Sequence, residues 1–187
     1  MDSSVFRPSP AHHPVWVGLR TLLYAILIWC LTLWVFPSVI VRIEYALTIQ
    51  QLSFPFQQPT AWVLFVAAAA FNLASAITMA VFGRGTPLPM DCAPRLVIQG
   101  PYRCVRNPMA IGGLGMGFAV AIGLGSFGVL IYVIAGMVFW NFVVRPIEER
   151  DLHKRFGPPY ENYRDQVKCW VPTFSFHPET QDESSSG

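Results

Sequence analysis

Three ionisable side chains directly follow a charge-free run of the sequence: Arg145, Glu148 and Glu149. Ionisable groups at the end of an apolar helix are costly unless they are paired or functional. Arg145 and Glu149 are one helical turn apart, so we expect them to form a forked ion pair. Glu148 is rotated by about 100° around the helix axis, and we therefore expect the two glutamates to have different roles. This pattern favours a functional polar site over a set of solvated charges.

A metal site is the first alternative for this region. His153 follows Glu149 by one helical turn, and the two side chains could in principle bind one metal ion. No further His or Cys lies at ligand spacing, so we expect a surface pair and no metal. The cysteines form no C-x-x-C pair, and most of them lie on the predicted cytosolic side, so free thiols are expected. They are Cys30, Cys92, Cys104 and Cys169.

The charges of the whole chain are few and unevenly distributed. Only 13% of the 187 residues are charged and 53% are hydrophobic, whereas soluble proteins have about 25% charged residues. Residues 21–41, 45–83 and 107–144 contain no charged side chain. So few charges cannot cover a soluble domain, which excludes an ordinary soluble enzyme. We expect a single membrane domain over residues 1–187.

Four apolar segments have lengths close to a membrane span, because about 20 helical residues cross the hydrocarbon core. The sequence therefore predicts an all-α polytopic membrane protein with about four transmembrane helices. We expect a kink at Pro37, a loop over residues 45–59, and a tight hairpin where residues 123–126 separate the last two helices. The predicted spans are Thr21–Val41, Thr60–Phe82, Met109–Leu124 and Phe127–Val144.

Basic residues indicate how these spans are oriented. Twelve of the 13 Lys and Arg residues lie on the side of the two termini, and Arg42 alone lies on the other side. This distribution predicts an integral protein of a bacterial inner membrane or an ER-type membrane, with both termini cytosolic. The same topology brings residues 83–106 and 145–168 together at the cytosolic face. Residues 1–20 are expected to form a cytosolic segment, and residues 173–187 a disordered tail.

The glycine-rich run 111–117 could indicate a dinucleotide-binding loop. No strand is predicted before it, and it lies inside an apolar helix, so we reject that interpretation. Small residues instead recur at every fourth position, which is typical of close helix packing in lipid. We expect Ala70 and Ala74 of the second span to pack closely in the same way. The recurring small residues are Gly113, Gly117, Ala121 and Gly125.

Three motifs follow one another in the C-terminal half. They are Gly100-Pro-Tyr-Arg-Cys-Val-Arg-Asn-Pro108, Arg145-Pro-Ile-Glu-Glu149 and Phe156-Gly-Pro-Pro-Tyr-Glu-Asn-Tyr163, followed by Val171-Pro172. In this order they resemble the isoprenylcysteine carboxyl methyltransferase and phospholipid methyltransferase superfamily of integral membrane enzymes. The family pattern is G-x-Y-x-x-x-R-[HN]-P, an apolar hairpin, R-x-x-x-E, F-G-x-x-Y-x-x-Y and V-P. The resemblance covers residues 83–174.

This resemblance implies a methyltransferase that binds S-adenosylmethionine at the cytosolic face. Arg145 would orient an acidic group of the substrate, and Glu149 would hold a polar part of the cofactor. Residues 83–172 would form the cofactor loop, the hairpin and the catalytic cap, after two spans in residues 21–82. The other cofactor contacts carried over by position are Leu96 and Val97 in the pocket lining, and Gly100, Tyr102, Asn107, Pro108 and Met109 in the turn.

Two positions depart from the common family pattern. Asn107 stands where many members have histidine, which removes an imidazole from the site. Ala110 stands where many members have tyrosine, which predicts a differently shaped route for the substrate.

The methyl acceptor is the least determined part of this interpretation. A carboxylate acceptor needs orientation but no general base, whereas an amine or hydroxyl needs one. No base stands out in the sequence, so a lipophilic carboxylate such as that of an isoprenylcysteine is the favoured acceptor. A phospholipid amine N-methyltransferase, a nicotinamide-dependent membrane reductase and a non-enzymatic membrane subunit stay open as alternatives. Membrane lipids are the expected partners, and nucleic acid is not.

Overall fold

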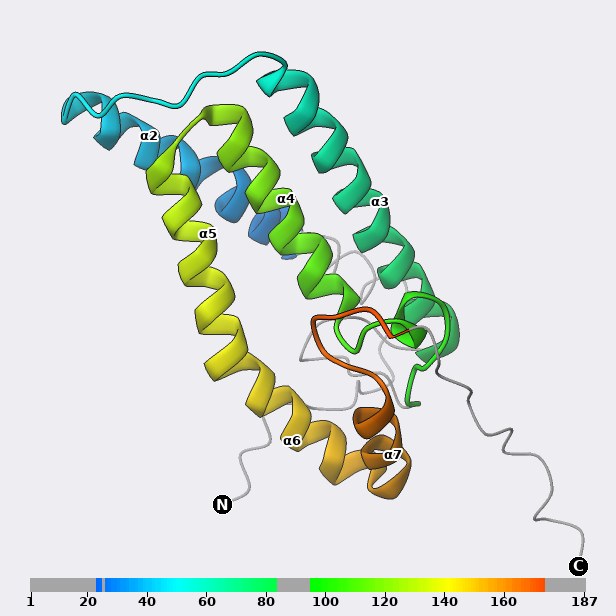
Figure 1. Ribbon diagram of the computed structural model, residues 1–187. Helices are drawn as coiled ribbons and strands as arrows, with labels where there is room; N and C mark the ends of the chain where they lie inside the picture. The colour runs from blue at the N-terminus through cyan, green and yellow to red at the C-terminus, as the bar shows by residue number, and fades with distance from the viewer. Residues whose placement is uncertain (1–22, 25, 84–94, 174–187) are drawn as a thin grey trace, which may run out of the picture.

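The computed structural model describes residues 23–24, 26–83 and 95–173, and every regular element within them is helical (Figure 1). The all-α fold expected from the sequence is confirmed. The predicted cytosolic segment 1–20, residues 84–94 of the predicted cofactor loop and the tail from residue 174 lie outside the described residues.

Three helices in the described part of the chain are long and apolar enough to cross a membrane, and a fourth apolar helix is shorter. The first, Ile26–Ala46, ends as α2 (Phe36–Ala46), and the second is α3 (Gln57–Gly83). The shorter helix is α4 (Pro108–Leu124). The third long helix consists of α5 (Phe127–Phe139), a π turn (Trp140–Val144) and α6 (Arg145–Phe156); a 3-10 turn (Gly100–Arg103) and α7 (Pro158–Gln166) complete the fold.

The α4–α5 hairpin has a sequence signal at each end, and the predicted tight turn is confirmed. Asn107 accepts a hydrogen bond from the backbone N–H of Ala110 at 3.0 Å, and Pro108 follows at the first helical position, which is the usual start of a helix. Gly125 ends α4 in the left-handed conformation, with φ of 61°. Ser126 then accepts from the N–H of Val129 at 3.0 Å and begins α5. We call the end of the bundle at Gly125 the turn end.

The first helix is longer than its predicted span, because it continues past Val41 to Ala46. Glu44 explains the extension. It is only 5% exposed, and its carboxylate accepts a hydrogen bond from the N–H of Gly128 at 2.6 Å. This N–H belongs to the first turn of α5, where the helix dipole favours a negative charge. One carboxylate oxygen of Glu44 therefore has a donor inside the bundle, and the residue does not end the helix, whereas the other oxygen is buried without a hydrogen-bond partner among the described residues.

Two π turns interrupt the long helices, and each ends two residues before a proline. Leu31–Val35 precedes Pro37, and Trp140–Val144 precedes Pro146. Proline lacks an N–H, and in a regular helix its ring collides with the carbonyl four residues earlier. A widened turn moves that carbonyl away. The irregularity that the sequence predicts at Pro37 thus has the form of a π turn, and a second one lies just before Arg145.

Helices α3 and α4 form the most extensive contact of the bundle. A Cβ atom on Gly112 would lie 2.8 Å from the Cβ and 3.0 Å from the backbone of Asn72, so only glycine fits there. The Asn72 side chain donates to the carbonyl oxygen of Met109 at 2.9 Å. The predicted glycine stripe faces other neighbours, since Gly113 meets Trp29 of the first helix, and Gly117 meets a valine of α5.

The prediction of close packing at Ala70 and Ala74 is wrong, because both residues are exposed on the outer face of α3. The buried face of α3 contains Asn72, Ser75 and Thr78 instead. A hydroxyl or amide that faces lipid without a partner is costly, whereas an alanine there is not. The polar side chains therefore face inward, where Ser75 and Thr78 each donate to the carbonyl four residues earlier.

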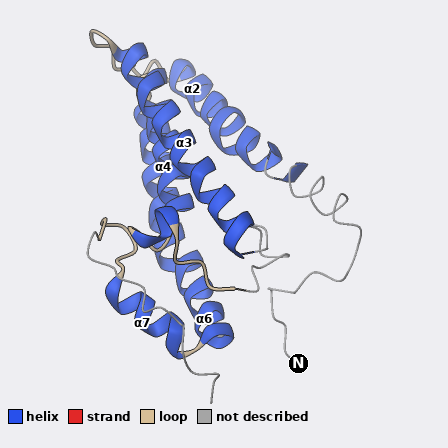
Figure 2. Cartoon of the chain, turned by 90° about the vertical axis from the view of Figure 1, so that its right-hand side faces the viewer, coloured by secondary structure: helices blue, strands red, loops and turns tan. Residues whose placement is uncertain are grey.

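At the end opposite the turn, the third long helix continues as α6 beyond the apolar run and α7 folds back beside it (Figures 1 and 2). Tyr160, Tyr163 and Val167 form a small buried cluster there. The chain after α7 runs next to the segment before α4, since the N–H of Arg106 donates to the carbonyl oxygen of Lys168 at 3.1 Å. We call this assembly of α6, α7 and residues 95–107 the cap.

Candidate functional site

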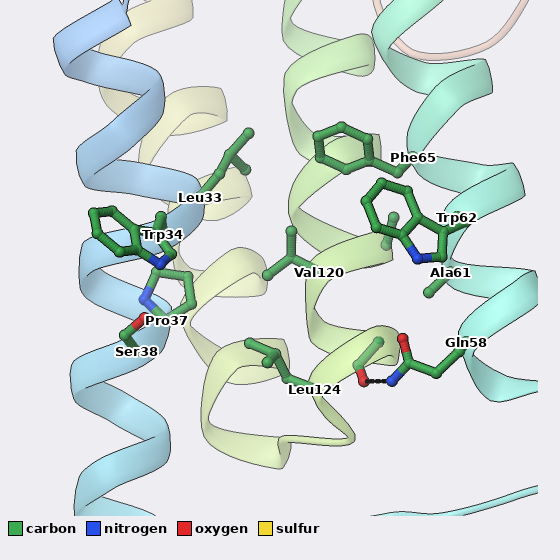
Figure 3. A pocket seen from close by; sticks show the side chains of 12 residues that line it. Leu33, Trp34, Pro37, Ser38, Gln58, Ala61, Trp62, Phe65, Val120 and Leu124 are labelled. Carbon is green, nitrogen blue, oxygen red and sulfur yellow. Dashed lines mark hydrogen bonds between the residues drawn. The ribbon is translucent and has the colours of Figure 1, made fainter.

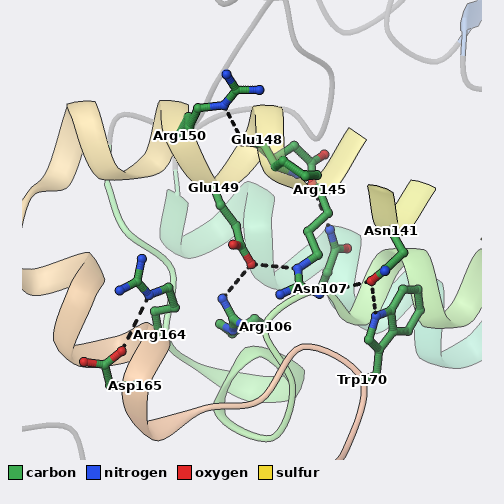
Figure 4. A network of polar contacts seen from close by, with 11 residues as sticks. Arg106, Asn107, Asn141, Arg145, Glu148, Glu149, Arg150, Arg164, Asp165 and Trp170 are labelled. Carbon is green, nitrogen blue, oxygen red and sulfur yellow. Dashed lines mark hydrogen bonds and ion pairs between the residues drawn. The ribbon is translucent and has the colours of Figure 1, made fainter. Parts of the chain in front are cut away.

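The centre of the cap is an ion cluster in which two guanidinium groups share one carboxylate oxygen (Figure 4). Arg106 Nη1 lies 2.7 Å and Arg145 Nε 2.9 Å from Glu149 Oε1. The ion pair expected between Arg145 and Glu149 is confirmed. It is not forked, because Arg145 contacts only Oε1 of Glu149, the same oxygen that Arg106 contacts. The three side chains are between 13% and 30% exposed, so solvent screens the pairs only in part. Glu149 Oε2 has no donor among the described residues.

Glu148 has a different environment from Glu149, as the helix rotation predicts. It accepts a hydrogen bond from the side-chain amide of Asn107 at 3.1 Å, and none of the described cations pairs with it. Its pKa is raised to about 7: burial raises it most, the negative charge of Glu149 also raises it, and the Asn107 hydrogen bond lowers it in part. Glu148 lies beyond the apolar run that ends at Val144, so it can exchange protons at the membrane surface near neutral pH.

Asn141 holds Arg145 from the other side. Its side-chain oxygen accepts from Arg145 Nη1 at 3.0 Å and from Trp170 Nε1 at 2.9 Å (Figure 4). Trp170 lies in the segment after α7 and also packs edge-on against Trp140, with ring centroids 5.2 Å apart. The last described segment of the chain therefore contributes to the orientation of Arg145.

The turn before α4 places several predicted cofactor contacts at this site. Asn107 joins α4 to Glu148, Pro108 is buried at the start of α4, and Met109 lies one residue further on. Tyr102 is buried, and its pKa is raised by that burial and then by the charge of Glu148. Its carbonyl oxygen accepts from the hydroxyl of Tyr163 at 2.7 Å, which ties the turn to α7.

The other predicted contacts serve the packing of the cap. Leu96 packs against the buried cluster around Tyr160, and Val97 is 5% exposed. Gly100 has a φ of 55°, and a Cβ there would lie 2.9 Å from the hydroxyl oxygen of Thr78. Gly100 is thus explained by the close approach of the turn to α3.

Three residues of the site received no role from the sequence: Arg106, Asn141 and Trp170. A signal was present for Arg106, because it is the arginine of the G-x-Y-x-x-x-R-[HN]-P motif in a chain with few charges. Its Nε atom is buried without a hydrogen-bond partner. Asn141 is the only polar residue between Ser126 and Arg145 apart from Tyr132 and Trp140, which was the available signal there.

His153 does not join Glu149. Its Nδ1 lies 3.2 Å from a carboxylate oxygen of Glu161 on α7, and both side chains are about half exposed. The described residues contain no group of three or more His, Cys, Asp or Glu side chains that could hold a metal ion.

An apolar helical bundle with one charged cap defines a polytopic membrane protein whose site lies at one surface. Residues 56–158 match the family model of phospholipid methyltransferases, from the start of α3 to the start of α7. This match covers more than half of the chain and includes both segments that form the ion cluster. The chain therefore belongs to the phospholipid methyltransferase family and is a membrane methyltransferase. No curated protein and no solved structure matches it.

Proposed function

We propose that this protein transfers a methyl group from S-adenosylmethionine to a lipophilic acceptor at the cap. The carrying observation is the direct contact of the two motif segments, Arg106 of the first with Glu149 of the second, at 2.7 Å. Residues 43 positions apart meet here beside the helix start at Asn107. We place the cap on the cytosolic side, where the basic residues predict it.

The residues present fit this cofactor. When bound, S-adenosylmethionine supplies an electrophilic methyl group on a sulfonium. Glu149 keeps one oxygen without a donor from the described residues, and a carboxylate suits the amino group of the cofactor. Arg106 and Arg145 fix the position of that carboxylate, so less freedom is lost when the cofactor binds. Tyr102, Asn107, Pro108 and Met109 form the adjoining turn that we assign to the adenosine part, with Leu96, Val97 and Gly100 in support.

Arg145 is the substrate-orienting residue in this proposal. Glu149 and Asn141 hold its Nε and Nη1 atoms, which leaves Nη2 for an anionic group of the acceptor. An isoprenylcysteine-like carboxylate would use this contact directly, and such an acceptor reacts without proton transfer. Methyl transfer is then mainly a matter of holding the two reactants in line.

Glu148 favours a second acceptor class, a phospholipid amine. A protonated amine must lose its proton before its lone pair can attack the methyl carbon, and the carbon–sulfur electron pair then returns to sulfur. A carboxylate with a pKa of about 7 and no ion pair among the described residues is suited to take that proton near neutral pH. In this scheme Arg145 binds the phosphate of the acceptor lipid.

A labelling experiment tests both the reaction and the acceptor. The purified protein in nanodiscs receives donor with a deuterated methyl group, and either phosphatidylethanolamine or a farnesylcysteine derivative. Mass spectrometry of the products then identifies the acceptor. Label on the amine supports the Glu148 scheme, and label on the carboxylate supports the Arg145 scheme. If neither acceptor is labelled and S-adenosylhomocysteine does not bind in calorimetry, the proposed function is wrong.

A further inference from the structure

An open groove of about 400 Å³ lies near the turn end, away from the ion cluster (Figure 3). Trp34 and Pro37 of the first helix form one wall, Trp62 of α3 forms the other, and Val120 of α4 lies between them. The groove lies on the outer, apolar surface of the bundle, since Trp34 and Trp62 are 71% and 65% exposed. Ligand sites of this size are typically apolar, with a few polar groups that fix the orientation of the ligand.

The polarity of the groove changes along its length. Leu33 and Phe65 line the end that points toward the middle of the bundle (Figure 3). Ser38 and Gln58 line the end nearest the turn, where Gln58 also donates to the carbonyl oxygen of Gly123 at 2.7 Å. The two tryptophans lie between these ends. An amphiphile with its tail toward the middle of the bundle and its head toward the turn would match this order.

A positive charge continues the groove at its polar end. Ser38, which lines the groove, and Arg42 are four residues apart on α2, so their side chains are neighbours on one face of the helix. Arg42 is exposed and has no ion pair or hydrogen bond with the described residues. Its sequence neighbour Glu44 is buried and bound to the N–H of Gly128, so it does not neutralise this arginine. A guanidinium in this position suits a phosphate.

We propose that this groove binds one phospholipid of the leaflet opposite the cap, with an acyl chain against Val120 and its phosphate at Arg42. The lipid is distinct from the methyl acceptor. Groove residues of α4 begin at Ala119, 11 residues after Pro108, and this separation corresponds to about 17 Å along the helix. The head of such a lipid points away from the ion cluster, so its role is to fill the space between the first helix and α3, which form opposite walls of the groove over α4.

Native mass spectrometry of the full chain tests the proposal, with phosphatidylglycerol and phosphatidylcholine of equal chain length as probes. We expect one bound lipid and a preference of about fivefold for phosphatidylglycerol, the attraction that one surface arginine gives to an anionic lipid. Arg42→Gln should remove this preference but retain a bound lipid. Val120→Phe fills the groove and should abolish binding of both lipids.

Val63→Phe is the matched control, because Val63 faces outward on α3 and is 69% exposed. Equal lipid binding by the Val63→Phe and Val120→Phe proteins would overturn the groove assignment. An unchanged preference in Arg42→Gln, a surface substitution that folding should tolerate, would overturn the phosphate contact. Calorimetry with S-adenosylhomocysteine on the same samples separates the two proposals. A loss of S-adenosylhomocysteine binding would contradict the proposed function but not the lipid groove.

Discussion

The two ends of the α4–α5 hairpin both concentrate polar groups, but they use them differently. At the turn end, side chains bond to backbone: Glu44 accepts from the N–H of Gly128, and Gln57 and Gln58 donate to carbonyl oxygens at the end of α4 at 2.7 Å. At the cap, side chains mainly bond to one another. Backbone groups in lipid must be satisfied for the fold to exist. The turn end therefore serves stability, whereas in the cap Glu149 keeps one carboxylate oxygen without a donor among the described residues.

The largest expected difference between the two ends is in methyl transfer and cofactor binding after one carboxylate is removed at each end. Glu149→Gln should lower methyl transfer by about a hundredfold or more, because both arginines lose their charged partner. It should also abolish the thermal shift produced by S-adenosylhomocysteine. Glu44→Gln is the matched change at the turn end and should leave that shift intact. A Glu149→Gln protein that still shows the full shift would contradict the role of Glu149.

The turn end should respond mainly in stability. Glu44→Ala leaves the N–H of Gly128 without an acceptor, and we expect a loss of about 2 kcal/mol in the free energy of unfolding. Glu44→Gln should cost less, since its amide oxygen can still accept. Thermal unfolding of both variants in the same detergent measures the difference. Identical unfolding temperatures for the alanine and glutamine variants would show that the hydrogen bond contributes nothing.

The pH dependence of stability should report the raised pKa of Glu148. The pKa of Glu148 is raised from 4.5 to about 7 in the folded protein, chiefly by burial, so this carboxyl destabilises the fold progressively as the pH rises from about 4.5 through 7. Glu148→Gln should therefore raise the unfolding temperature at pH 8 and have little effect at pH 5. Thermal unfolding at the two pH values tests this. A larger gain at pH 5 would contradict the raised pKa.

The smallest effect is expected at the positioning contact of Arg145. Trp170→Phe removes the N–H that bonds to Asn141 but retains a ring beside Trp140. We expect the KM for the methyl acceptor to rise about threefold to tenfold, with the binding of S-adenosylhomocysteine unchanged. Steady-state kinetics with the acceptor found by labelling, together with calorimetry, checks both values. Weaker binding of S-adenosylhomocysteine with an unchanged acceptor KM would place Trp170 on the cofactor side.

The sequence by itself determined the membrane bundle and the order of its parts. Charge-free runs marked the helices. Asn107, Gly125 and Ser126 cap the two helices of the hairpin, and such caps depend only on residues close by in the sequence. The pairing of Arg145 with Glu149 was also predictable, since helix geometry alone brings residues four apart together. The resemblance of three ordered motifs then indicated the family.

Contacts between distant segments were decided only by the tertiary structure. Arg106 reaches Glu149, Trp170 reaches Asn141, and Glu44 reaches the start of α5 because helices and the chain after α7 pack in one particular way. The same packing turned Asn72, Ser75 and Thr78 inward in place of the alanines that the sequence favoured. Local spacing cannot specify which distant atom satisfies a polar group. That choice depends on which partners remain available once the bundle excludes water.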